Sequence, residues 1–167
     1  DNLIAAAERR FDEHGYTATG MDRLTQAAGM SSRTLYKRVE SKAALMGRVL
    51  AARDRRFVDG MAVASVDALF SMLMEWVERE GARGCLFLRS LAETGGASPE
   101  IAEAVSAHKA RFVARIRAIV AGDLGRDDAQ LAEQILILIE GAAHAAVYRG
   151  PGTIAAARTA AATLMDA

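Results

Sequence analysis

Residues Leu24 to Tyr36 read Leu-Thr-Gln-Ala-Ala-Gly-Met-Ser-Ser-Arg-Thr-Leu-Tyr, and this stretch decides the fold of the chain. It contains two short helical patterns joined by a turn at Gly29. A helix, a glycine-containing turn and a second helix form the arrangement that presents one helix to the DNA major groove. The small side chains of Ala27 and Ala28 favour a close crossing of the two helices. The stretch therefore predicts a helix-turn-helix, with an ordinary helical hairpin as the alternative.

The second helix of this motif has one apolar and one polar face. We expect Met30 and Leu35 to anchor it in the core, with hydroxyl and cationic side chains on the opposite side. Hydroxyls and cations are the groups that bind phosphates and base edges. The polar face consists of Ser32, Arg33, Thr34, Tyr36, Lys37 and Arg38. Its alternative interpretation is a solvated surface, and Tyr36 in particular also fits a packed aromatic residue with its hydroxyl outward.

Helical patterns flank the motif on both sides. Apolar residues at helical spacing predict a helix over residues 1–14, which stops at the His14-Gly15 pair. Thr19 with Asp22 resembles a capping box and predicts the start of the next helix, which ends at Gly29. Ser31 or Ser32 is expected to cap the helix that runs to about Arg38. Ser41 is expected to cap a helix from Lys42 to about Val58.

The remainder of the chain predicts five longer helices separated by glycines. They are expected at about 64–80, 84–94, 98–121, 127–148 and 152–166. Aromatic residues make up only 5% of the chain, which contains two prolines, so helix formers dominate throughout. The sequence predicts an all-α fold of about nine helices, with an amino-terminal helix-turn-helix domain at 1–57 and a helical domain at 58–167.

The charge distribution fits this division. The net charge of the chain is zero, but residues 1–57 carry a net charge of +4 and residues 58–167 a net charge of −4. A basic amino-terminal segment joined to an acidic carboxy-terminal segment is typical of a DNA-binding module attached to a domain that does not bind DNA. The apolar runs, such as Ile135 to Ile139, are shorter than the ~20 residues of a membrane span. We therefore expect a soluble protein without a membrane partner.

Cysteine usage predicts the compartment. Cys85 is the single cysteine, so the chain can form no internal disulfide, and the sequence contains no Cys/His cluster of the kind that binds a structural metal. We expect a cytoplasmic protein that needs no metal or other cofactor.

Four motifs within the first 50 residues carry a resemblance to a known family. Gly-Tyr at Gly15, Ala-Gly-x-Ser at Ala28, Thr-Leu-Tyr at Thr34 and Ser-Lys-x-x-Leu at Ser41 resemble the DNA-binding domain of TetR-family regulators. The sequence departs from the family at Val39, where phenylalanine is commoner, and at Arg33, where a small residue is commoner. After residue 60 the resemblance is weaker and rests on runs such as Gly84 to Leu88.

The resemblance implies a role for each candidate DNA-binding residue. Ser32 and Arg33 would face base edges, and arginine suits guanine, whose O6 and N7 accept a bidentate pair. Lys37 would reach bases or backbone, and Thr19 or Gly20 at the start of the second helix would offer a backbone N–H to a phosphate. The family's usual phosphate contacts are matched by Thr34, Tyr36, Arg38 and Lys42. The predicted DNA-binding residues are Thr19, Ser32, Arg33, Thr34, Tyr36, Lys37, Arg38 and Lys42.

The last two predicted helices have wide apolar faces rich in small residues. The resemblance implies that two such helices from each of two subunits form a four-helix dimer interface. The alternative is that these faces complete the core of a single chain. The predicted interface residues are Leu131, Ile135, Leu138, Ile139, Ala142, Ala146, Ala156, Ala160 and Leu164.

A small-molecule pocket is expected in the carboxy-terminal domain. Glu140 and His144 lie four residues apart on one helix face and would hold a polar group of a ligand. Each candidate also has an ordinary interpretation as a core or surface residue. The candidates are Trp76, Cys85, Phe87, His108, Phe112, Glu140 and His144.

Together these patterns predict a transcriptional regulator and not an enzyme, because no catalytic constellation emerges. We expect a homodimer that binds a palindromic double-stranded DNA operator and is released by a small organic effector, and we favour a repressor. The alternatives are a DNA-binding protein without an effector, against which the neutral net charge argues, and a helical enzyme or interaction module.

Overall fold

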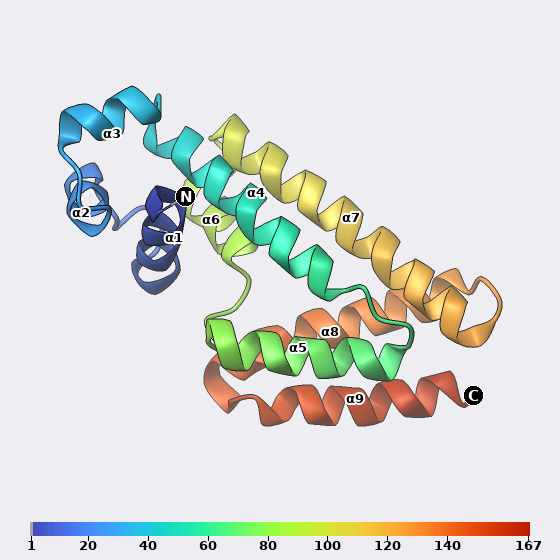
Figure 1. The fold of residues 1–167 in the computed structure, drawn as a ribbon. Helices are drawn as coiled ribbons and strands as arrows, with labels where there is room; N and C mark the ends of the chain where they lie inside the picture. Colours follow the sequence, from blue (N-terminus) through green and yellow to red (C-terminus); the bar gives the residue numbers. More distant parts are fainter. Residues whose placement is uncertain (1) are drawn as a thin grey trace. The chain divides into compact units, whose positions relative to one another are not determined.

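The computed structural model describes residues 2–167, which form nine α-helices and no strand (Figure 1). This confirms the predicted all-α class, and each predicted helix is present within a few residues of its expected bounds. The helices are α1 (Asn2–His14), α2 (Met21–Ala27), α3 (Ser32–Arg38), α4 (Lys42–Gly60), α5 (Val66–Glu80), α6 (Leu86–Thr94), α7 (Pro99–Leu124), α8 (Ala129–Arg149) and α9 (Gly152–Met165).

The helices pack into two compact units. The first contains residues up to Arg56 together with Leu86–His108, and the second contains Phe57–Cys85 together with Lys109–Ala167. The boundary between them falls inside α4 and α7. The packing units therefore differ from the domains 1–57 and 58–167, because α6 and the beginning of α7 pack with the amino-terminal helices. The functional division at residue 57 stays a prediction.

Apolar residues at helical spacing build the core of the first unit. Leu3 and Phe11 of α1, Leu24 of α2, Leu35 of α3 and Leu45 of α4 are all fully buried. Burial of a leucine or phenylalanine side chain contributes about 1.5–3 kcal/mol. These contacts hold the short helices α2 and α3, which would be unstable in isolation.

Polar contacts join α6 to α1 within this unit. The Arg89 guanidinium donates hydrogen bonds to the carboxylate of Asp12 at 3.3 Å and to its carbonyl at 3.0 Å, and the Asp12 side chain is buried. The Glu93 carboxylate accepts a hydrogen bond of 2.7 Å from the backbone N–H of Thr17. These contacts hold α6 against α1 and the loop that follows it within the first unit.

The helix caps test the local predictions. Ser31 caps α3, where its hydroxyl accepts from the N–H of Thr34 at 3.2 Å, and Ser41 likewise accepts from Ala44 at 2.9 Å. The capping box at Thr19 is wrong, because α2 begins after Gly20 without a side-chain cap. The Thr19 hydroxyl instead donates to the carbonyl of Gly15 at 2.7 Å, inside the core.

The second unit is built around α5, α8 and α9, with part of α7 against them. Its core includes Leu69 and Phe70 of α5, Ile116 of α7, Ile135 of α8 and Ile154 of α9, each at most 2% exposed. Ser65 caps α5 through a hydrogen bond from the N–H of Ala68, and Asp128 caps α8 through the N–H of Leu131. The second unit is therefore a helical bundle with its own core.

The helix α8 is apolar on more than one face. By length and composition alone α8 is able to cross a membrane, because an 18-residue stretch of it has a mean hydropathy of 1.3. This differs from the expectation that the apolar runs are too short for a membrane span. One third of this 18-residue stretch is buried inside the second unit, where α8 packs against α9 and α5. The buried part makes α8 a core helix, and its exposed apolar side chains need a separate explanation.

Candidate nucleic-acid-binding surface

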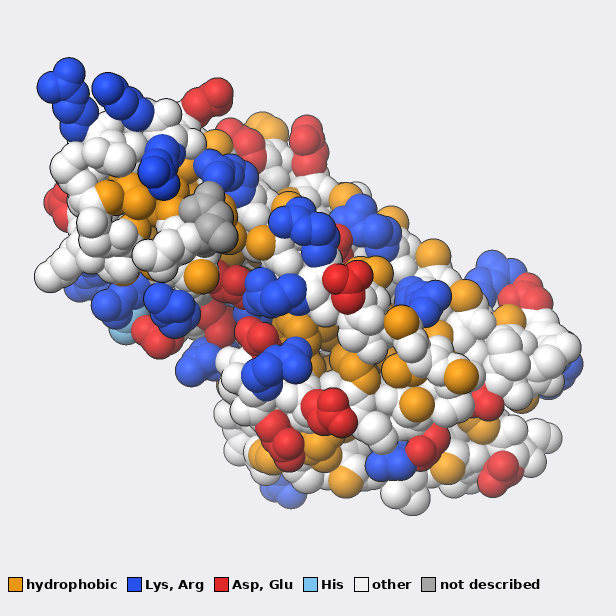
Figure 2. Space-filling view, in the orientation of Figure 1, with side chains coloured by type: hydrophobic (Ala, Val, Ile, Leu, Met, Phe, Trp, Pro, Cys, Tyr) orange, Lys and Arg blue, Asp and Glu red, His pale blue; other side chains and the backbone are white. Residues whose placement is uncertain are grey.

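The helix α3 presents its polar face to solvent. Leu35 is fully buried and Val39, just beyond the helix, is 3% exposed, so these two side chains anchor α3 in the core. Figure 2 shows Lys and Arg side chains gathered over this part of the molecule. The exposed residues of α3 are Ser32, Arg33, Thr34, Tyr36, Lys37 and Arg38, in agreement with the predicted orientation. Tyr36 is 57% exposed, so its packed-aromatic interpretation is wrong.

Most side chains of this face are available to a partner. Within residues 2–167, no ion pair or hydrogen bond engages the side chain of Arg33, Lys37 or Arg38. The Thr34 hydroxyl shares a hydrogen bond of 2.9 Å with Ser31 at the helix start. Unpaired cations on a rigid helix beside hydroxyl groups form a surface that is complementary to phosphates and to the acceptor atoms of guanine.

The structure gives Lys42 a structural role that sequence reasoning missed. Its ammonium group donates to the backbone carbonyl of Tyr16 at 3.0 Å and lies 4.3 Å from the centre of the Tyr16 ring. The contact joins the start of α4 to the loop between α1 and α2. Burial, with a smaller contribution from the Glu100 charge, raises the pKa of Tyr16, so its phenol stays protonated. The predicted phosphate contact of Lys42 stays a prediction for its remaining donors.

Thr19 does not belong to this surface. The residue is 0% exposed, its hydroxyl is bonded inside the unit, and its N–H donates to the carbonyl of Tyr16 at 3.3 Å. The prediction that Thr19 contacts DNA is wrong, because the loop between α1 and α2 folds this residue into the core. The exposed residue at the start of α2 is Gly20.

The predicted ligand-binding residues fall into separate groups, and one of these lies in the first unit. The ring of Phe87 stacks on His108 at 3.7 Å between centroids, and His108 Nδ1 lies 2.7 Å from Asp54 Oδ1. All three residues are buried. This arrangement matches a hydrogen-bonded core histidine, the ordinary interpretation of His108. Cys85, which is half-buried, belongs to the second unit.

The other predicted ligand-binding residues lie in the second unit. Phe57 packs edge-on against Trp76 at 4.9 Å and against Phe112 at 5.6 Å, so the structure brings these aromatic residues together. Glu140 is bound to Lys109, with 2.5 Å between the carboxylate and the ammonium group. His144 is exposed on α8. The expected shared role of Glu140 and His144 has no support, because Lys109 already holds the carboxylate.

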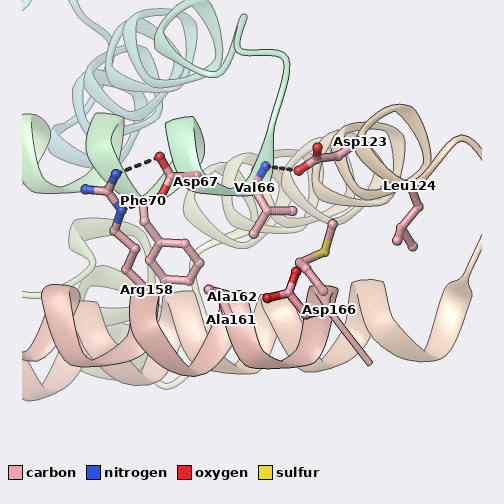
Figure 3. Close-up of a pocket in the computed structure, with 10 residues that line it drawn as sticks. Val66, Asp67, Phe70, Asp123, Leu124, Arg158, Ala161, Ala162 and Asp166 are labelled. Atoms are coloured by element: carbon pink, nitrogen blue, oxygen red, sulfur yellow. Dashed lines mark hydrogen bonds and ion pairs between the residues drawn. The ribbon is translucent and has the colours of Figure 1, made fainter.

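The surface of the second unit includes a hollow and a groove. The hollow has a volume of 340 Å³ and lies between α5, the end of α7 and α9 (Figure 3). Two of its three carboxylates are engaged: Arg158 binds the Asp67 carboxylate through two contacts of 2.5 and 2.6 Å, and Asp123 accepts from the N–H of Val66 at 2.8 Å. Within residues 2–167, the exposed Asp166 carboxylate has no ion pair or hydrogen bond. The bond from Arg158 lowers the pKa of Asp67. No sequence signal linked residues so far apart.

The groove has a volume of 450 Å³ and lies along α5. Trp76 lines it, and Trp76 alone of the predicted ligand-binding residues does so. Sequence reasoning missed the other groove residues, because their apolar and charged types occur on any helix surface. They are Gly60, Val63, Asp67, Ala68, Ser71, Met72, Glu75 and Arg79.

The predicted dimer face of α8 requires a correction. Leu131, Ile135, Ile139, Ala142 and Ala146 are buried inside the second unit against its own helices. A partner cannot contact them directly, so the alternative that they complete the core is correct. Leu138 and Leu164 are half-buried against the same core, whereas Ala156 and Ala160 are exposed.

Comparison with known proteins agrees with this geometry. Residues 3–49 match the model of bacterial regulatory proteins of the tetR family, and residues 62–161 match the tetracyclin repressor-like C-terminal domain. No curated protein sequence matches the chain.

Solved structures share the fold over the whole chain. A TetR-family transcriptional regulator from Streptomyces coelicolor is 22% identical over 99% of this chain and 93% of its own, with a TM-score of 0.88. A putative tetR transcriptional regulator from Streptomyces avermitilis is 25% identical over 99% and 94%, with a TM-score of 0.79. The regulatory protein TetR from Rhodobacter sphaeroides is 23% identical over 99% and 96%, with a TM-score of 0.80.

The two matched models cover both the helix-turn-helix and the helical bundle. Regulators of this family act by binding DNA and are not enzymes, which agrees with the predicted function class. With a DNA-binding helix exposed on the first unit and the family's carboxy-terminal domain in the second, this chain belongs to the TetR family of transcriptional regulators.

Proposed function

We propose that this protein is a ligand-responsive repressor that binds a palindromic operator as a homodimer in the cytoplasm. The observation that carries the proposal is the exposed face of α3, where Arg33, Lys37 and Arg38 have no partner within residues 2–167. A recognition helix of this length reads only a few base pairs, so specific binding needs a second copy. A two-fold pair reads half-sites about 34–36 Å apart or a multiple of that distance.

An exposed apolar face on α8 supports the homodimer. Ile137 is 63% exposed and Tyr148 is 79% exposed, and Gly141 and His144 lie between them at helical spacing on the same face. Exposed apolar side chains on one face mark an interaction surface. A β-carbon added at Gly141 meets no atom within 4 Å, so this face is open in the single chain. We propose that a second copy covers it.

Small exposed side chains on α9 extend this surface. Ala155, Ala156, Thr159 and Ala160 are exposed, and small residues allow two helices to approach closely. The symmetric partner would therefore contact α8 and α9 through their outer faces. Ala156 and Ala160 keep the interface role predicted from the sequence, while the buried α8 residues support the face from within.

A gel shift against the DNA upstream of the protein's own gene tests operator binding. We expect a retarded complex at nanomolar protein, competed by the same sequence and not by an equal amount of random DNA. A reporter under that operator tests repression, since transcription should rise when the regulator is deleted. The alternative, a DNA-binding protein without an effector, predicts a shift that no small molecule reverses.

Arg33 provides the sharpest test of base reading. Because its guanidinium is exposed, unpaired and near the start of α3, Arg33→Ala should cost about 1–3 kcal/mol of operator binding and relax specificity at one position. Random-sequence DNA should lose much less. Competition gel shifts with operators varied at single positions measure both effects.

Arg55→Ala is the matched control, because Arg55 is an exposed arginine of the same unit that lies on α4 and not on α3. It should leave the position-specific discrimination unchanged. Equal losses on operator and random DNA for Arg33→Ala would reduce Arg33 to a phosphate contact.

A further inference from the structure

The groove along α5 combines an apolar lining with one uncompensated negative charge. Its volume of 450 Å³ falls in the range of roughly 300–1,000 Å³ typical of small-molecule sites. Val63, Met72 and Trp76 supply the apolar surface. Methionine is flexible and polarisable, so it adapts to ligands of different shape. In Figure 2, apolar side chains are visible over the region of α5 beside acidic and basic ones.

The backbone at Gly60 keeps one side of the groove open. A β-carbon built at Gly60 would lie 3.6 Å from Cγ and Sδ of Met72. That distance is ordinary van der Waals contact, so a larger side chain at this position would extend over Met72 and occupy the groove. The absence of a side chain at Gly60 therefore contributes directly to the space that a ligand needs.

Of the charged groups in the groove wall, Glu75 is the one left uncompensated. The Asp67 carboxylate is bound to Arg158 through two contacts. The Arg79 guanidinium faces the Glu80 carboxylate at 3.4 Å and lies 5.2 Å from the centre of the Trp76 ring. Within residues 2–167, the Glu75 carboxylate has no ion pair or hydrogen bond. The groove therefore favours a positive charge near Glu75.

The position of Arg79 shows that a cation is accommodated here. Trp76 is 8% exposed, and the guanidinium of Arg79 covers part of its ring. Phe57 fixes the ring from another side through an edge-on contact of 4.9 Å. Indole is the aromatic side chain that attracts cations best. A ligand ammonium group that displaced Arg79 would contact the Trp76 ring in its place and would pair with the Glu75 carboxylate.

We propose that this groove is the effector site and that its effector is an amphipathic organic cation, with an apolar body against Met72 and Trp76 and an ammonium group at Glu75. The effector role rests on the proposed function, whereas the cation selectivity of the groove does not. The hollow of Figure 3 is a weaker candidate, because two of its three carboxylates are already engaged and no indole ring lines it.

Three compounds with one apolar body test the selectivity: 4-phenylbutylamine, 4-phenylbutanol and 4-phenylbutanoate. Trp76 is the single tryptophan, so its fluorescence in phosphate buffer without DNA reports the groove directly. The amine should bind about fivefold more tightly than the alcohol, and the carboxylate most weakly. Equal affinities, binding preference for the carboxylate, or no fluorescence change with any compound would overturn the proposal.

Substitutions at Glu75 and Gly60 test whether these groove residues cause the binding and the preference for the amine. Glu75→Gln should make the affinities for the amine and the alcohol equal. Glu78 is an exposed glutamate of α5 outside the groove, so Glu78→Gln should keep the fivefold difference. Gly60→Leu should block all three compounds, and Gly122→Leu, at a helical glycine of α7 with open space around it, should block none. Circular dichroism of each variant checks the helical fold. An unchanged preference in a folded Glu75→Gln variant would refute the role of the carboxylate.

Operator release is measured separately by gel shift. If the amine binds and releases the operator, the groove is the effector site. If the amine binds with the predicted selectivity but the operator stays bound, the cation site holds and its effector role fails. If the protein binds no operator at all, the proposed function fails, and the fluorescence result still decides the selectivity of the groove.

Discussion

Glu8→Ala should destabilise the protein by about 3–5 kcal/mol, one of the two largest effects that the structure predicts. The Glu8 carboxylate of α1 accepts from Arg53 of α4 at 2.8 Å and from Arg56 at 2.6 Å. The side chains of Glu8 and Arg53 are both buried, so the variant removes a carboxylate that is bound to a buried guanidinium. A buried charge that loses its partner keeps its desolvation penalty without the compensating attraction.

Urea denaturation followed by circular dichroism measures this loss. Glu13→Ala is the control, because Glu13 is an exposed residue of the same helix whose pair with Arg10, at 3.8 Å, contributes little. It should change the free energy of unfolding by less than about 0.5 kcal/mol. Glu8→Gln, which keeps an acceptor but loses the charge, should fall between the two. A loss below about 1 kcal/mol for Glu8→Ala would show that the pair is not what joins α1 to α4.

Ile137→Asp should abolish the homodimer and with it tight operator binding. In the proposed dimer this exposed α8 side chain becomes buried against the partner, where a carboxylate would be desolvated without a counter-charge and would face its symmetric copy. The cost corresponds to a loss of about 100-fold or more in dimer affinity. Operator affinity should fall with it, because a single α3 reads too few base pairs.

Sedimentation equilibrium at micromolar protein and a gel shift measure these two effects. Val113→Asp is the matched control, since Val113 is an exposed apolar residue of α7 in the same unit, 43% exposed. It should leave both the dimer and the gel shift intact. If Ile137→Asp stays dimeric, the outer face of α8 is not the interface, and a wild-type monomer with tight binding to one operator copy would remove the need for a dimer.

The helix-turn-helix could be predicted from the sequence because its signals are local. Ser31 caps α3 three residues from the N–H that it accepts from, and Gly29 has a φ of +63°, a conformation that glycine adopts without strain. The spacing of Leu35 from its polar neighbours determined which face of α3 is exposed. Each of these features depends on residues a few positions apart, so the exposed set on α3 matched its prediction.

Which side chains are buried depended on contacts between helices, and local sequence patterns do not specify those contacts. The α8 pattern showed an apolar helix, but Ile135 faces the core while Ile137 faces solvent, and both are isoleucine. Thr19 fitted a capping pattern, yet the chain before α2 folds its hydroxyl toward Gly15. A periodic pattern identifies an apolar face, whereas the neighbouring helix decides whether that face is covered.

The sequence by itself therefore determined the helices, their order and the exposed polar face of α3, because those properties follow from local spacing. Its motifs between Gly15 and Leu45 carried the resemblance to the family. Only the tertiary structure decided the groove at Glu75, the separation of His108 from Trp76 into different units, and the open face at Ile137. The pairs that shape these regions, such as Asp54 with His108 and Asp67 with Arg158, lie 54 and 91 residues apart. Their formation depends on how whole helices pack, and packing is a property of the assembled core.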